Sequence, residues 1–179
     1  MSHRAHPLAG SFHPSGTSAA GPVSASGWRV TTRNKALAVV VAELLGGLPE
    51  RRWTTDADAF EVDTQSASVR IVIDGPGAVS AGMTTSDQHR APQPETKIAF
   101  RLAEDYGLGA FSLKSASWDL AESVSDLRQS LASIGGEVLG ELLLERVEFT
   151  ARGGVSLSYC RPVVKVIGPW LEQLEQEAA

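Results

Sequence analysis

Cysteine is almost absent from this chain of 179 residues, because Cys160 is the only one. A single cysteine excludes an intramolecular disulfide framework, and it also excludes a cysteine-rich zinc or iron–sulfur site. Such a low thiol content fits a reducing compartment. We therefore expect a cytoplasmic protein.

Long apolar runs are also missing. The longest extends from Ala36 to Ala42 and is followed by Glu43, whereas about 18 consecutive apolar residues are needed to cross a bilayer. The first residues, Met1 to Arg4, lack the apolar stretch of a secretory signal. These features predict a protein without membrane association.

The net charge of the chain is small and negative. The chain has 16 Lys+Arg and 21 Asp+Glu, a formal net charge of −5, and 42% of its residues are hydrophobic. This composition is typical of a globular domain, and it excludes a histone-like polycation. A negative chain gains little from releasing counterions on DNA, so any nucleic-acid contact has to be local.

Common catalytic motifs are missing too. The sequence has no phosphate-binding loop, no dinucleotide-binding glycine pattern, no nucleophile-elbow serine and no zinc-protease helix motif. Three of the four histidines, His3, His6 and His13, lie in a Pro- and Ser-rich segment that does not preorganise metal ligands. We expect no catalytic residues, no metal site and no cofactor, and hence a protein that is not an enzyme.

The chain divides by composition into a tail and a domain. Residues 1–27 are mostly Ser, Ala, Gly and Pro, with few large apolar side chains. Such a segment cannot offset the entropy lost on ordering. The sequence therefore predicts a disordered tail over residues 1–27 and a single domain over residues 28–179.

Two amphipathic helices are predicted inside this domain. Asn34 is placed to cap the first, whose apolar residues recur at helical spacing from Leu37 to Leu45 before Gly46-Gly47. The second extends from Leu120 to Ile134, with apolar spacings of 4, 3, 4 and 3, and ends at Gly135-Gly136. Both helices are expected to pack one face against a core.

The remaining ordered segments have the pattern of strands. They cover residues 28–32, 60–63, 69–73, 97–102, 110–114, 142–149 and 155–167. The order lacks regular strand–helix–strand alternation, so we expect an α+β fold with a mostly antiparallel β-sheet. From Val69 onward the order also fits an OB-like barrel. Pro162 lacks an amide proton, which predicts a bend, a bulge or an edge strand. Trp118, between a strand and the second helix, is expected to anchor the core.

Basic and aromatic residues alternate near the start of the domain. Arginine and tryptophan side chains together can hold phosphates and stack on bases. The competing interpretation is that Trp28 and Trp53 anchor the core while the arginines are solvated. The candidate residues for binding nucleic acid or a partner are Trp28, Arg29, Arg33, Arg51, Arg52, Trp53, Arg101 and Arg152.

Three stretches of the sequence, read together, resemble a known family. The first is Trp28-Arg29-Val30-Thr31-Thr32 with the helix ending Leu44-Leu45-Gly46-Gly47. The second is Ile98-Ala99-Phe100-Arg101-Leu102-Ala103-Glu104-Asp105, followed by Leu108-Gly109-Ala110-Phe111 and Ser115-Ala116-Ser117-Trp118. The third is Val147-Glu148-Phe149 with Ser158-Tyr159-Cys160-Arg161-Pro162-Val163-Val164-Lys165-Val166. In order and spacing they resemble the recombination directionality factors of actinophage large serine-integrase systems.

The resemblance implies a function based on protein contact. It implies an accessory protein that binds a large serine integrase on DNA and favours excision over integration, with no chemistry of its own. The integrase would be the protein partner, and DNA would be bound indirectly or through a local basic patch.

The chain departs from this family in one segment. Members of the family have a longer, cysteine-containing insertion before the Phe100-Arg101-Leu102 strand, whereas Gln88 to Thr96 is short and free of cysteine here. The alternative function is a single-stranded DNA-binding protein of phage or mobile-element replication or recombination. Trp28, Trp53 and Arg101 would then contact the strand.

Overall fold

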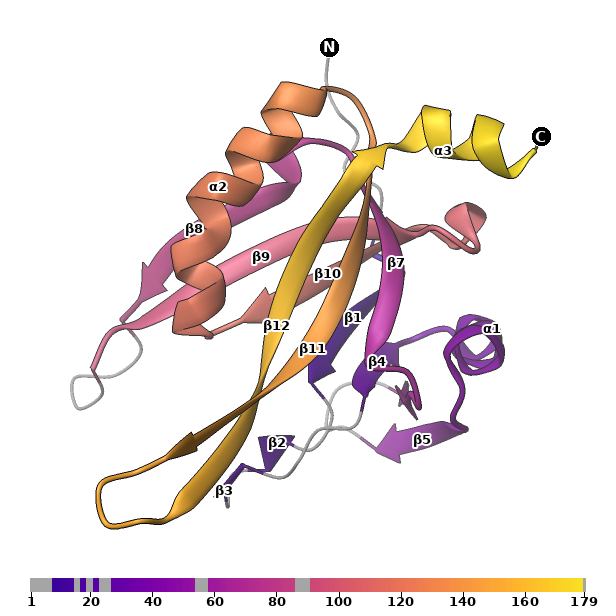
Figure 1. Cartoon of the computed structure of the whole chain (residues 1–179). Helices are drawn as coiled ribbons and strands as arrows, with labels where there is room; N and C mark the ends of the chain where they lie inside the picture. Colours follow the sequence, from indigo (N-terminus) through magenta and orange to yellow (C-terminus); the bar gives the residue numbers. More distant parts are fainter. Residues whose placement is uncertain are drawn as a thin grey trace.

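The computed structural model describes residues 8–14, 17–18, 21–22, 27–53, 58–85 and 91–178 (Figure 1). The strands are β1 (Gly10–Pro14), β2 (Thr17–Ser18), β3 (Gly21–Pro22), β4 (Trp28–Thr32), β5 (Pro49–Trp53), β6 (Asp58–Asp63), β7 (Ser68–Ile73), β8 (Val79–Thr84), β9 (Gln93–Leu102), β10 (Ala110–Ser115), β11 (Val138–Thr150) and β12 (Ser156–Pro169). The helices are α1 (Lys35–Leu45), α2 (Trp118–Ile134) and α3 (Trp170–Glu177), with short 3₁₀ turns η1 (Pro76–Ala78) and η2 (Tyr106–Leu108). The predicted α+β class is confirmed.

One large sheet organises the fold. It has ten strands, in the order β12-β11-β7-β9-β10-β1-β4-β6-β5, with β8 paired to β9 outside this path. The β1–β10 pairing is parallel and the other pairings in this sheet are antiparallel. The end strands β12 and β5 are not neighbours in this order, so the sheet is open and the expected OB-like barrel is wrong. Pro162 lies in the end strand β12, which agrees with the predicted edge strand, because a proline has no amide hydrogen to donate to a second neighbouring strand.

Both long helices form where their caps and apolar stripes predict. The Asn34 side chain accepts hydrogen bonds from the backbone N of Ala36 at 3.0 Å and of Leu37 at 3.4 Å, which begins α1. Ser117 caps α2 by accepting from the backbone N of Leu120 at 3.3 Å. Helix α1 contacts β4, β5 and β6, whereas α2 contacts β8, β9 and β12. The helices therefore cover different parts of the sheet.

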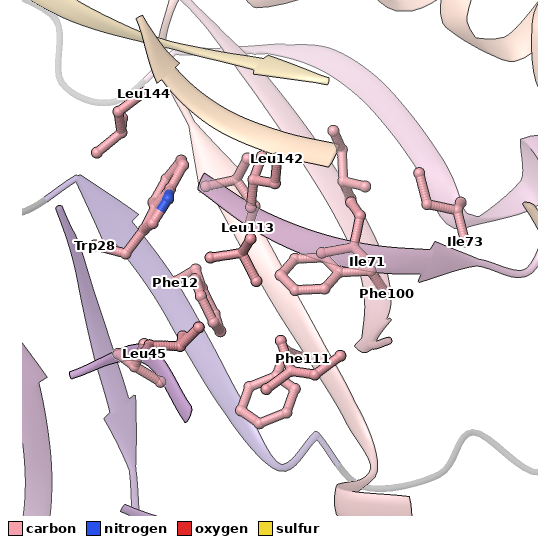
Figure 2. Packing of buried hydrophobic residues seen from close by; sticks show 14 of the residues in the cluster. Phe12, Trp28, Leu45, Ile71, Ile73, Phe100, Phe111, Leu113, Leu142 and Leu144 are labelled. Carbon is pink, nitrogen blue, oxygen red and sulfur yellow. The ribbon is translucent and has the colours of Figure 1, made fainter. Parts of the chain in front are cut away.

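The core is centred on aromatic rings from four strands (Figure 2). Phe12 of β1 lies edge-on to Phe100 and Phe111, with ring centroids 5.3 Å and 5.5 Å away. Trp28 of β4 packs against the same Phe12 ring at 6.1 Å. Offset and edge-on arrangements of this kind are the favoured ones for aromatic rings. This cluster fixes β1 in the middle of the sheet.

The position of β1 corrects the prediction of a disordered tail over residues 1–27. Residues 10–14 pair with β10 on one side and β4 on the other, and Phe12 has no exposed surface. The two neighbouring strands provide hydrogen-bond partners for the backbone of this short segment. One large buried apolar side chain is then enough to stabilise its ordered state. Residues 1–7, 15–16, 19–20 and 23–26 of the predicted tail lie outside the described residues.

A smaller apolar cluster lies apart from the main core and anchors α3. Trp170 packs there with Val72 of β7 and Leu139 of β11, and its ring stacks on Tyr106 at 6.4 Å. An ion pair of 2.8 Å between Arg70 and Glu177 also fastens the helix. In the described part of the chain, no helix is long and apolar enough to cross a membrane.

Candidate protein-interaction surface

Trp28 is a core residue. Its side chain has no exposed surface, and its indole N–H donates a hydrogen bond of 3.2 Å to the backbone oxygen of Ala67. A ring enclosed in this way cannot stack on a base or touch a partner. The structure therefore removes Trp28 from the candidate binding residues and supports the competing interpretation, a core anchor. The side chain of Trp53, the last residue of β5, lies outside the described residues.

Acidic partners neutralise part of the predicted basic patch. Arg29 donates from Nε to Asp63 at 2.8 Å, and this hydrogen bond raises the pKa of the arginine. Arg52 lies 2.9 Å from a carboxylate oxygen of Glu61, which also faces Arg29 at 3.7 Å. Arg29 and Arg52 thus share an acidic residue, and little of their charge is left for phosphates.

The other candidate arginines are dispersed. Arg33 and Arg51 are exposed near α1 and in β5, and Arg152 is exposed in the turn between β11 and β12. Arg101 of β9 lies over the Tyr106 ring, with its guanidinium carbon 4.8 Å from the ring centroid. Of the predicted residues, the structure brings together Arg29 and Arg52, but it does not collect the set into one surface.

A different surface is built by the long hairpin of β11 and β12. Its outer half projects past the body of the sheet (Figure 1). Antiparallel pairing sets Phe149 opposite Leu157 and Val147 opposite Tyr159. Because side chains alternate across a strand, these four lie on one face of the hairpin. We call this set the hairpin face.

The hairpin face is apolar and exposed. Phe149, Leu157 and Tyr159 have 47%, 43% and 37% of their surface accessible. The rings of Phe149 and Tyr159 meet nearly edge-on, with centroids 6.2 Å apart. Three large apolar side chains gathered on a projecting element are unlike the scattered apolar residues of an ordinary surface, and they make the hairpin face a candidate interaction surface.

Trp118 extends this apolar surface and corrects the expectation of a core anchor. It is 57% exposed at the start of α2. The buried stripe of α2 begins at Leu120 and continues through Val124 and Leu127. Residues two apart on a helix point in different directions, so a side chain at position 118 faces away from that stripe.

A groove of about 640 Å³ joins Trp118 to the hairpin face, because Trp118 and Tyr159 both line it. Its other lining residues include Lys114 and Arg161. The hydroxyl of Tyr159 donates a hydrogen bond of 3.2 Å to a carboxylate oxygen of Asp119. Partial desolvation and this hydrogen bond raise the pKa of Tyr159, so the phenol stays protonated at neutral pH.

Arg161 holds the base of the hairpin face in place. Its guanidinium lies 2.7 Å from a carboxylate oxygen of Glu145 and 3.6 Å from one of Asp119. The cross-strand pairing of residues 145 and 161 puts this ion pair at the end of the hairpin face nearest the sheet. Charged residues thus border the hairpin face at its base, and the exposed Arg152 lies at the tip of the hairpin.

These residues point to binding. Tryptophan, tyrosine and arginine are the types that contribute most to protein–protein affinity, and all three occur around the groove. In the described residues, no three His, Cys, Asp or Glu side chains gather as metal ligands would. No protein-family model matches the sequence, and no solved structure matches the chain.

Sequence reasoning missed the hairpin face, although its signal is present. Val147 and Phe149 alternate with charged and polar residues, as do Leu157 and Tyr159. Such alternation predicts a strand with one apolar face, and that face is normally assigned to the core. It lies on the surface here because the hairpin is longer than the strand beside it, since β7 pairs with β11 only over residues 138–143.

Proposed function

We propose that this chain is a non-enzymatic accessory protein that binds a large serine integrase on DNA and favours excision over integration. The proposal begins from the sequence resemblance to recombination directionality factors. It is supported by an exposed apolar surface suited to protein contact.

One observation gives the proposed function most of its support. The segment from Ser115 to Trp118 belongs to the second stretch of the resemblance, whereas Val147 to Phe149 and Ser158 to Val166 belong to the third. In the fold, parts of the second and third stretches border the groove and the hairpin face. Segments distant in sequence that converge on an exposed surface are expected when that surface is the part that works.

The mechanism needs no chemistry from this chain. An integrase on DNA can adopt arrangements that differ in which attachment sites they recombine. A protein that binds one arrangement more tightly shifts the population toward it, by about tenfold for each 1.4 kcal/mol of difference in binding free energy. An exposed aromatic surface on a projecting hairpin is suited to recognising such an arrangement.

The alternative, binding of single-stranded DNA, has weaker support. Trp28 is buried, and Arg29 is paired with Asp63. Arg101 lies against Tyr106. Stacking platforms and free cations, the two requirements of such a protein, are therefore not assembled by the predicted residues that the structure describes.

Recombination with the cognate integrase tests the proposal. Adding the protein to integrase should promote recombination between the left and right attachment sites of a prophage. Replacing Leu157 with Glu puts a charge on the hairpin face and should abolish this effect. The matched control is Leu48→Glu, because Leu48 is 79% exposed in the turn before β5 and should tolerate the charge.

Binding to DNA alone supplies the opposing outcome. A chain of net charge −5 should bind oligonucleotides weakly at physiological salt without integrase. Sub-micromolar binding to single strands, together with no effect on the integrase, would contradict the proposal and favour the single-strand binder.

A further inference from the structure

The groove beside the hairpin face has a rigid lining. Trp118 and Tyr159 line it together with Pro14 and Pro162. Prolines and aromatic rings are rigid, so such a lining loses little conformational freedom when something binds. A volume of about 640 Å³ is large enough for one or two bulky side chains.

The charges around the groove are uneven. Among the described residues that line it, Lys114 and Arg161 are basic and Asp119 is the one acidic residue. His13 also lines it, and burial lowers the pKa of this histidine, so its ring is neutral at pH 7. These described lining residues therefore have a formal charge of +1, although the whole chain has −5.

Lys114 has room for a second partner. It lies 2.9 Å from a carboxylate oxygen of Glu95, and its side chain is 59% exposed. Lys97 lies at the same distance from the other oxygen of Glu95, so the carboxylate is already balanced without Lys114. An incoming carboxylate could therefore pair with Lys114 at little cost to Glu95.

A second copy of the chain is a poor occupant. The hairpin face spans three residues along each of two strands, roughly 10 Å by 10 Å, and a stable dimer buries about 800 Å² per partner. A patch of this size is better matched to one segment of another protein, anchored by a side chain in the groove.

We infer that the groove binds a peptide segment of a partner protein that places a large apolar side chain between Trp118 and Tyr159 and an adjacent carboxylate on Lys114. The inference deepens the proposed function and rests on its premise that the chain acts by protein contact. It adds the chemistry of the recognised segment.

The test uses a phage-displayed library of random peptides, about 12 residues long, selected against the full-length protein. The enriched peptides should share an apolar residue next to Asp or Glu. The affinity of a labelled enriched peptide, measured by fluorescence anisotropy, should fall at least tenfold on Trp118→Ala, as is usual for a tryptophan at the centre of an interface.

Two lysines provide the matched comparison. Lys114→Glu should remove the preference for acidic peptides, whereas Lys165→Glu should leave it unchanged, because it does not disturb the ion pairs of Glu95. Both lysines are exposed, but only Lys114 lines the groove. Thermal melting of each variant shows that the fold is kept.

Several outcomes would overturn the inference. They are enriched peptides without an acidic residue, binding that survives Trp118→Ala, or equal effects of the two lysine changes. Self-association that Trp118→Ala abolishes would instead identify a second copy as the occupant. Because peptide selection does not involve recombination, a chain that binds acidic–apolar peptides but leaves the integrase unaffected would refute the proposed function alone.

Discussion

The hydroxyl of Tyr159 lies 3.2 Å from a carboxylate oxygen of Asp119, and this hydrogen bond joins the long hairpin to the first turn of α2. The two residues are 40 positions apart in sequence. Trp118, next to Asp119, and Tyr159 of the hairpin face both line one groove. The candidate interaction surface is therefore a tertiary feature, assembled from two elements that are distant in the sequence.

Tyr159 should contribute through its ring more than through its hydroxyl. Tyr159→Phe removes one hydrogen bond at the surface, which contributes about 0.5–1.5 kcal/mol at most. We expect this variant to keep near-normal stability in urea and near-normal promotion of excision. Tyr159→Ala should keep the fold but lose excision, because the ring of the hairpin face is gone. Full activity of Tyr159→Ala would show that the partner binds elsewhere.

Phe12 should be essential to stability. It has no exposed surface and contacts two other phenylalanine rings, so Phe12→Ala should lower the free energy of unfolding by about 3–5 kcal/mol. Urea denaturation followed by tryptophan fluorescence measures the change. Leu8→Ala is the control, since Leu8 is 57% exposed just before β1. An unchanged midpoint for Phe12→Ala would mean that β1 is dispensable.

The helices were predictable because their signals are local. Asn34 caps α1, and the apolar spacing from Leu120 marks the buried side of α2; both depend on neighbours within a few turns. Strand β1 was not predictable, because its order depends on β10 and β4, which lie far along the chain. The open sheet was missed for the same reason, since strand patterns do not specify which strands pair.

The candidate interaction surface was harder to predict than the fold. Sequence reasoning selected Trp28 and Arg29 because tryptophan and arginine bind ligands, but composition cannot distinguish a buried tryptophan from an exposed one. Trp28 is the first residue of β4, and Trp118 is the first residue of α2. Trp28 is buried, whereas Trp118 is 57% exposed. Only the tertiary arrangement separates them.

Two buried threonines should respond to the same substitution in opposite directions. Thr96 is fully buried, and its hydroxyl has no hydrogen-bond partner among the described residues. A buried hydroxyl without a partner costs about 1–3 kcal/mol, so Thr96→Val should raise the free energy of unfolding. The hydroxyl of Thr64 accepts from the backbone N of Trp28 at 2.9 Å and donates to the backbone oxygen of Ser66 at 3.1 Å.

Thr64→Val should therefore destabilise the protein by about 1–3 kcal/mol, because it leaves a buried backbone N–H unpaired. Urea denaturation of both variants provides the measurement. If both substitutions shift the midpoint in the same direction, the hydrogen bonding of one of these threonines differs from that described here.

Stability should fall when the pH drops below about 6.5, and His13 should account for part of the loss. Burial lowers the pKa of His13 in the folded protein from its ordinary value of 6.5. The unfolded chain therefore takes up a proton first as the pH falls, which favours unfolding. His13→Gln removes this proton uptake, so its urea midpoint should decrease less than that of the wild type between about pH 7.5 and pH 5.5. Glu95 does not interfere in this interval: its lysine partners lower its pKa from 4.5, so the stability it contributes is lost only at more acidic pH. Parallel decreases in the two proteins would show that the environment of His13 is the same in the folded and unfolded states.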